Sequence, residues 1–142
     1  MSLKIYIGAD HAGFEMKEAI EEYLLSKSYQ VEDLGAHSTD SVDYPDFAHA
    51  VATNVEKEEG SFGILFCGSA NGVCITANKH KNIRAALAWN TEIAELGRAH
   101  NNANVLCIPA RYVSVDAAEK MVQRFLTTAF EGGRHQRRVE KI

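Results

Sequence analysis

Residues 64–72 read Ile64-Leu65-Phe66-Cys67-Gly68-Ser69-Ala70-Asn71-Gly72, an apolar run followed by a loop of small residues, and they lead into a helix-like segment from Val73. The run is typical of a buried strand, and the glycines predict a tight turn after it. Cys67 is therefore expected at the carboxyl end of a strand, beside backbone N–H groups at the start of a helix. Open α/β sheets bind anionic ligands at such places, and a thiolate is favoured there.

Four further apolar runs accompany this one, so the predicted strands lie at about residues 4–8, 30–34, 62–67, 84–88 and 104–108. They alternate with segments of helical period, which indicates βα units and a mostly parallel sheet covered on both faces. The predicted fold class is α/β, with a five-stranded parallel sheet in a three-layer α/β/α sandwich. In such a fold the ligand lies over the carboxyl ends of the strands.

The helical segments carry recognisable starts. Pro45 suits a first turn, and Asn90 and Ser114 are predicted to cap the helices that follow them. The first helix has apolar residues from Met16 to Leu24 at helical spacing, and its other side carries Lys17 with three glutamates, which predicts a solvent-facing side for all four.

The composition limits the class of protein. With 142 residues, 46% of them hydrophobic, and a net charge of −4, the chain is expected to form one domain over residues 1–142 and to bind neither nucleic acid nor acidic membranes. Only the tail at about 131–142 is basic, which suggests a local anion site. No signal peptide or membrane span is recognisable, and the three cysteines form no Cys-x-x-Cys pair, so we expect a cytoplasmic protein without disulfides or zinc.

Other predicted strand ends also carry reactive side chains. Asp10 and His11 follow the first strand, as Cys67 follows the third, and all three are predicted to meet at one edge of the sheet. His100 precedes the fifth strand and should lie on the opposite edge, so it reaches the same site only from a second subunit. Val73 stands where a Cys-x5-Arg phosphatase needs arginine, and neither a P-loop nor Gly-x-Gly-x-x-Gly is present.

Several separated motifs occur in an order that resembles the type B ribose-5-phosphate isomerases of the RpiB/LacAB family. They are Asp10-His11-x-Gly13-Phe14, Asp43-Tyr44-Pro45, Cys67-Gly68-Ser69-x-x-Gly72, Ala77-Asn78-Lys79, His100-Asn101-x-x-Asn104-Val105-Leu106 and Glu131-Gly132-Gly133-Arg134-His135-Gln136-x-Arg138-Val139. The resemblance covers essentially the full length. It implies a Rossmann-like domain, and a homodimer or dimer of dimers whose active sites are completed across the subunit interface.

The resemblance also implies an activity: reversible isomerisation of D-ribose 5-phosphate and D-ribulose 5-phosphate through a cis-enediolate, in the non-oxidative pentose phosphate pathway and without a metal or other cofactor. By the family's pattern, Cys67 matches the base, and Ser69 and His100 match the residues that open the furanose ring. Substrate-binding positions match Asp10, Tyr44, Gly68, Ser69, Ala70, Asn71, Gly72 and Asn101. Phosphate-binding positions match His11, Arg111, Arg134 and Arg138, with His100, Asn101 and Arg111 expected from the partner subunit.

The sequence departs from the family's pattern at two positions. Ala70 stands where many members have glycine, although a Cβ disfavours positive φ. Some relatives carry a glutamate base six residues after the cysteine position, where this chain has Val73, so the role of base falls to Cys67. We expect the loop after Cys67 to stabilise its thiolate, and we interpret Cys74, Cys107, His37, His49, His80 and His135 as structural or surface residues.

Three alternatives stay open at this stage. Relatives with this scaffold isomerise six-carbon sugar phosphates such as allose or galactose 6-phosphate. A non-catalytic sugar-phosphate sensor would bind without turnover, and the joint presence of Cys67, Ser69 and His100 speaks against it. A thiol redox protein is less favoured, because no resolving cysteine lies nearby in the sequence.

Overall fold

The structure, a computed structural model, describes residues 3–142. Within them, parallel strands form one sheet in the order β2-β1-β3-β5-β4. The strands are β1 (Lys4–Ala9), β2 (Gln30–Asp33), β3 (Phe62–Cys67), β4 (Ala85–Leu87) and β5 (Val105–Pro109). The helices are α1 (Phe14–Ser26), α2 (Tyr44–Lys57), α3 (Asn71–Ala77), α4 (Thr91–Asn101), α5 (Val115–Thr127) and α6 (Arg134–Val139). The predicted α/β fold class and the five parallel strands are confirmed.

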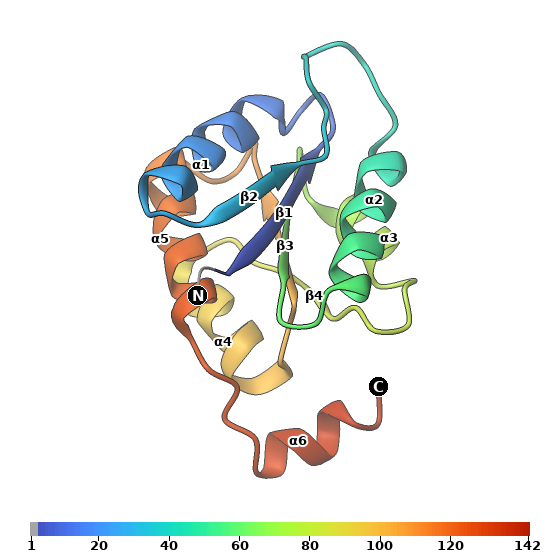
Figure 1. The fold of residues 1–142 in the computed structure, drawn as a ribbon, viewed down its shortest axis with the longest axis vertical. Helices are drawn as coiled ribbons and strands as arrows, with labels where there is room; N and C mark the ends of the chain where they lie inside the picture. Colours follow the sequence, from blue (N-terminus) through green and yellow to red (C-terminus); the bar gives the residue numbers. More distant parts are fainter. Residues whose placement is uncertain (1–2) are drawn as a thin grey trace.

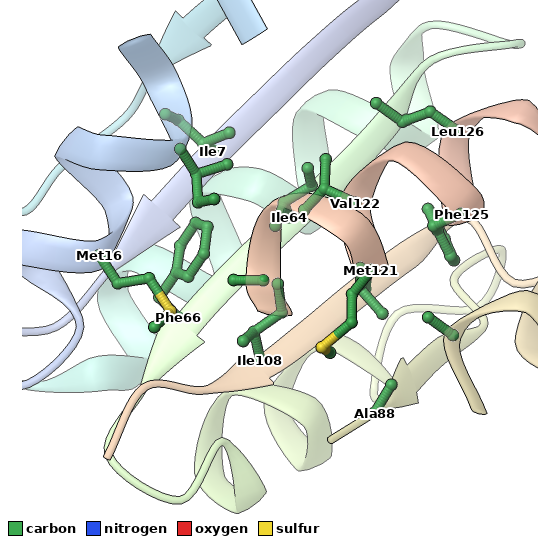
Figure 2. Packing of buried hydrophobic residues seen from close by; sticks show 14 of the residues in the cluster. Ile7, Met16, Ile64, Phe66, Ala88, Ile108, Met121, Val122, Phe125 and Leu126 are labelled. Carbon is green, nitrogen blue, oxygen red and sulfur yellow. The ribbon is translucent and has the colours of Figure 1, made fainter. Parts of the chain in front are cut away.

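Helices cover both faces of the sheet, which confirms the three-layer arrangement (Figure 1). On one face α1, α4 and α5 pack over side chains of β1, β3 and β5, and Figure 2 shows Met16, Phe66, Ile108 and Phe125 in this cluster. On the other face α2 and α3 cover a second cluster that includes Cys67 and Cys107. Full burial of each large apolar side chain contributes roughly 1.5–3 kcal/mol. These two layers fix the carboxyl ends of β1 and β3 relative to each other.

The predicted helix starts are confirmed. Asn90 Oδ1 accepts a hydrogen bond from the Ile93 amide at 2.9 Å, and Ser114 Oγ accepts one from the Ala117 amide at 3.1 Å. Pro45 lies in the first turn of α2, where its missing N–H costs no helical hydrogen bond. None of the described helices combines the length and the apolar character needed to cross a bilayer.

Two features differ from the sequence prediction. Lys17 does not face solvent: its side chain is completely buried and its ammonium contacts Asp33. The predicted solvent-facing side of the first helix is thus wrong for this residue, because residue 17 faces the end of β2. The basic tail contains the short helix α6, which buries none of its own residues and lies beyond α4 in Figure 1.

Candidate active site

The strand order changes direction at β1 and β3, which lie side by side in the sheet. β2 follows β1 on one side and β3 pairs with β1 on the other, and the crossover helices α1 and α2 lie on opposite faces. Open α/β sheets bind ligands at such a switch point. Asp10 follows β1, and its amide donates a hydrogen bond to the Phe66 carbonyl at 3.3 Å. The structure therefore brings Asp10 and Cys67 together, as the sequence predicted.

The Cys67 thiol lies 3.5 Å from Oδ2 of Asp10, and both residues are buried. Burial raises the pKa of the Cys67 thiol, and the neighbouring Asp10 carboxylate raises it further. The backbone N–H groups of Ala70 and Gly68 act in the opposite direction, but they do not outweigh these two effects. The expectation that the loop stabilises the Cys67 thiolate is therefore wrong in its net effect, because burial and Asp10 hold the pKa of the thiol above its ordinary value.

The loop after Cys67 contains an unusual backbone conformation. Ala70 has φ of +64° and is completely buried just before α3, so it adopts the left-handed conformation despite its Cβ. This conformation costs roughly 1–2 kcal/mol for a residue with a side chain. Ser69 is exposed beside it, and its Oγ accepts hydrogen bonds from the Asn71 amide at 3.3 Å and from Asn71 Nδ2 at 3.2 Å. The Ser69 hydroxyl hydrogen is then free to point toward a ligand.

His11 is oriented by a loop from a different part of the chain. Its Nδ1 accepts a hydrogen bond from the Val42 amide at 3.2 Å. In the neutral ring this acceptor role leaves the proton on Nε2, so His11 presents an N–H donor at its other nitrogen. A donor at that position suits an anion.

The side chains of Tyr44 and Arg111 occupy the space beside Gly72, in the first turn of α3, and beside Gly68, in the loop before it. A Cβ on Gly72 would lie 2.4 Å from Cε1 of Tyr44, so the tyrosine ring occupies the space of a side chain there. A Cβ on Gly68 would lie 3.1 Å from a guanidinium nitrogen of Arg111, which follows β5. The Arg111 amide also donates to the Gly68 carbonyl at 3.1 Å. Both side chains thus lie over the loop that follows Cys67.

This arrangement corrects the grouping that the resemblance implied for Arg111. Its side chain lies against Gly68 of its own chain, so Arg111 belongs with Cys67 and not with the residues expected from a partner. The physical reason is that Pro109, at the end of β5, pairs with Cys67 in register, and the next residues cross over the loop.

His100 and Asn101 lie at the other edge of the sheet, as expected, because α4 ends there before β5 begins. The arginines expected with His11, Arg134 and Arg138, lie at that edge too. The two arginines are one turn apart on α6. The segment before α6 is held against α4, because the Glu131 amide donates a hydrogen bond to the Ala99 carbonyl at 3.0 Å. The candidate residues of one chain therefore form two groups at opposite edges of the sheet.

His100 is braced by two side chains that the sequence did not single out for this purpose. Its ring stacks on that of His135, with centroids 4.1 Å apart, and its Nε2 lies 3.7 Å from Glu131 Oε1. Partial burial and the nearby His100 ring lower the pKa of His135, which favours its neutral form. The spacing Glu131-x3-His135 is the only sequence signal for this contact.

Two groups of side chains in the described residues bring possible metal ligands together. His100, Glu131 and His135 form one, but the two imidazoles are nearly parallel, with 11° between their planes, so their lone pairs do not converge on a common point. Glu18, Glu21 and Asp33 form the other, and the Lys17 ammonium already supplies a cation to two of these carboxylates. Neither arrangement fits a metal as it stands.

The chain is a doubly wound α/β protein with a thiol, a carboxylate and side chains suited to an anion at its switch point, the place where this class of fold binds small molecules. Residues 5–142 match the Ribose/Galactose Isomerase family, and the chain belongs to that family.

Relatives cover nearly the whole chain. A protein of Mycoplasma genitalium named probable ribose-5-phosphate isomerase B is 48% identical over 144 residues, covering 100% of this chain and 95% of its own. The structure of a ribose 5-phosphate isomerase RpiB from Thermotoga maritima has a TM-score of 0.97 at 48% identity, over 99% of this chain and 97% of that one. The structure of ribose-5-phosphate isomerase B from Mycoplasma genitalium with bound ribulose-5-phosphate has a TM-score of 0.95 at 47% identity, over 99% and 94%.

Proposed function

We propose that this chain interconverts D-ribose 5-phosphate and D-ribulose 5-phosphate. Its family is one of sugar isomerases, and full-length relatives at close to half identity are named for this reaction. The observation that carries the proposal is the Cys67 thiol at the switch point, with the N–H groups of Gly68 and Ala70 acting on its sulfur. A base beside N–H donors is what proton abstraction next to a carbonyl requires.

The proposed reaction moves two protons and needs no external reactant. After ring opening, the Cys67 thiolate removes the proton from C2 of the aldose. The electron pair of that C–H bond forms the C1–C2 double bond of the cis-enediolate, and the π electrons of the C1 carbonyl move onto O1. The thiol then returns a proton to C1, while the hydroxyl proton on O2 is transferred to O1, so that O2 becomes the ketone oxygen and O1 the hydroxyl of the ketose. Donors in the loop from Gly68 to Gly72 stabilise the enediolate oxygens. No cofactor is required, since only protons are transferred.

Ring opening needs an acid and a base near the furanose oxygen. We assign this step to Ser69 and His100, with Asp10, Tyr44, Asn71 and Asn101 holding the sugar hydroxyls. The free Ser69 hydroxyl hydrogen supports this assignment, as does the stacking that orients the His100 ring. The phosphate would be bound by His11 and Arg111 from one edge and by Arg134 and Arg138 from the other. One guanidinium group can donate two parallel hydrogen bonds to the oxygens of a phosphate.

A site of this composition requires two copies of the chain. His100, Asn101, Arg134 and Arg138 lie at the opposite edge from Cys67, so one copy cannot supply both groups to one substrate. We therefore propose a homodimer, or a dimer of dimers, in which each copy completes the other's site. A two-fold axis makes two equivalent sites at once. We also propose a cytoplasmic location, because Cys67, Cys74 and Cys107 are free thiols and a thiol base needs a reducing environment.

The test is turnover of ribose 5-phosphate in deuterated water, with NMR following product formation and the deuterium that enters C1 of ribulose 5-phosphate and C2 of the remaining ribose 5-phosphate. We expect turnover with exchange in the wild type and none in Cys67→Ala, whose affinity for inorganic phosphate stays unchanged. Cys74→Ala is the matched control and keeps activity, because that half-buried thiol lies against the Ala85 carbonyl of β4 and not beside Asp10. Full activity of Cys67→Ala would remove Cys67 from the mechanism. Allose and galactose 6-phosphates in the same assay measure the preference for five carbons.

The phosphate assignment has its own test. Arg138→Ala is expected to raise KM for ribose 5-phosphate with a smaller effect on kcat, because the lost contact is to a group that does not react. Arg137→Ala, on the same helix and without an assigned contact, serves as the control. An unchanged KM in Arg138→Ala would indicate that Arg138 does not contact the phosphate and that the tail is an ordinary solvated segment.

A further inference from the structure

Lys17 is the largest polar side chain that the described fold buries completely, and the reaction proposed above does not use it. Its ammonium lies 2.5 Å from Asp33 Oδ2 and 3.0 Å from Glu18 Oε1, and it also lies over the ring of Phe14. A buried ion pair is a weak source of stability, since removing two charges from water offsets much of their attraction. The position of this pair is more informative than its strength.

Asp33 connects the pair to the end of β1. While Oδ2 accepts from Lys17, Oδ1 accepts a hydrogen bond from the Gly35 amide at 2.9 Å. The Gly35 carbonyl in turn accepts from the Ala9 amide, and the Ala36 amide donates to the Ala9 carbonyl, both at 2.7 Å. Ala9 directly precedes Asp10. The ammonium of Lys17 is thus joined through one carboxylate to the backbone that carries the Asp10 and His11 pair.

The same loop reaches His11 at its other end. Residues 34–43 leave β2 beside Ala9 and return toward α2, and the Val42 amide donates to His11 Nδ1 on the way. Figure 1 shows this segment as a long loop between β2 and α2 at the top of the view. Asp33 anchors its first residues, and Val42 near its end determines which nitrogen of His11 carries the proton. A loop of this length needs an anchor to present one amide to one ring nitrogen.

We propose that Lys17 and Asp33 are positioning residues, which hold the loop of residues 34–43 so that His11 presents its Nε2–H to the substrate's phosphate. The inference rests on the proposed function for its substrate. Its structural part, the control of the His11 ring by a buried ion pair, is independent of turnover. Lys17 and Asp33 contact neither substrate nor reacting atoms.

The experiment compares Lys17→Met, which keeps the length of the side chain and removes the charge, with Lys4→Met. Lys4, on β1, forms a more exposed pair with Glu32 of β2 at 3.3 Å, so it controls for the loss of an ion pair to the same strand that carries Asp33. We expect Lys17→Met to raise KM for ribose 5-phosphate, and the inhibition constant of inorganic phosphate, about tenfold, with kcat changed less than threefold. Lys4→Met should change none of these values.

A second measurement reads the histidine directly. The nitrogen chemical shifts of the His11 imidazole report the Nε2–H tautomer in the wild type, and in Lys17→Met we expect a mixture of tautomers. The variant Lys17→Met/Asp33→Asn removes both charges but keeps an acceptor for the Gly35 amide, and it serves if the single variant does not fold. A folded variant with reduced thermal stability, wild-type KM and an unchanged tautomer would overturn the proposal. Absence of wild-type turnover would instead overturn the proposed function, and the phosphate affinity and tautomer would still decide the role of Lys17.

Discussion

The sulfur of Cys67 lies 3.5 Å from a carboxylate oxygen of Asp10, so the group proposed as the base rests beside a like charge in its active form. Burial and this carboxylate raise the pKa of the thiol, while two backbone N–H groups lower it. Below that raised pKa the thiol keeps its proton, and only the small ionised fraction can remove a proton from carbon. Cys67 thus acts as a base only through its ionised form, and its thiol is the acid that returns the proton.

The pH dependence of Cys67 alkylation tests this relationship. A raised pKa means that the thiolate forms only at higher pH, so the rate with iodoacetamide should rise about tenfold per pH unit from pH 7 to beyond 9. The measurement needs a Cys74→Ala background, since hydrogen bonds from Cys107 and Asn78 lower the pKa of Cys74 and make it the faster competitor. Asp10→Asn should shift the Cys67 profile to lower pH. A profile that stays in place would show that burial alone sets this pKa.

Gly72 and Tyr44 should be energetically coupled. An alanine in the helix at residue 72 gains about 1 kcal/mol of helix propensity, but its Cβ would displace the Tyr44 ring and cost about 1–3 kcal/mol. We expect Gly72→Ala to lower the free energy of unfolding and raise KM in the wild-type background. In a Tyr44→Ala background, the same change should be neutral or stabilising. Additive effects in urea unfolding of the four proteins would contradict the contact.

Ala70 should tolerate glycine but not a branched side chain. Glycine relieves roughly 1–2 kcal/mol of left-handed strain, but it loses a buried methyl worth about 0.8 kcal/mol and gains entropy in the unfolded chain. We therefore expect Ala70→Gly to stay within about 1 kcal/mol of the wild type and to keep its activity. Ala70→Val adds a β-branched side chain to the same backbone and should lose more than about 2 kcal/mol and most turnover. Thermal unfolding and initial rates provide both comparisons.

Mixing two inactive variants tests the two-edge arrangement. Cys67→Ala damages one edge of a chain and His100→Asn damages the other, so a mixed dimer contains one doubly damaged site and one intact site. After the variants are unfolded and refolded together at equal concentration, we expect about a quarter of wild-type activity, because half of the dimers are mixed. Cys67→Ala refolded with Ser69→Ala is the control and should stay inactive, since both changes lie on the same edge. Activity no higher than that of the separate variants would argue for a site within one chain.

The sequence predicted the layers because apolar period and capping residues act locally. The strand at residues 62–67, the caps at Asn90 and Ser114, and the opposite placement of Cys67 and His100 all depend on spacing along the chain, and the structure bears them out. Contacts between segments that are far apart in the sequence were harder to predict. Lys17 had the spacing of a surface residue, and only the end of β2, sixteen residues away, makes its burial favourable.

The chemistry of individual groups was predicted less well for the same reason. The loop after Cys67 suggested a stabilised thiolate, but the Asp10 carboxylate that opposes it comes from the end of another strand. Arg111 was grouped with the wrong edge, because its position depends on the register of β5 against β3. His135 was interpreted as a structural or surface residue, and its stacking on His100 depends on how the tail lies against α4, which the sequence does not give.

The tail that carries α6 contributes little to the fold of its own chain. No residue of α6 is buried, and Gly132 and Gly133, both with positive φ, have open space around them. A chain truncated before Gly132 is therefore expected to fold and to survive in a cell. In the proposed dimer each copy lends its arginines to its neighbour, so such a truncation would remove them from the site that contains the intact copy's Cys67. In a mixed dimer, a truncated copy would thus impair a site whose Cys67 belongs to an intact copy.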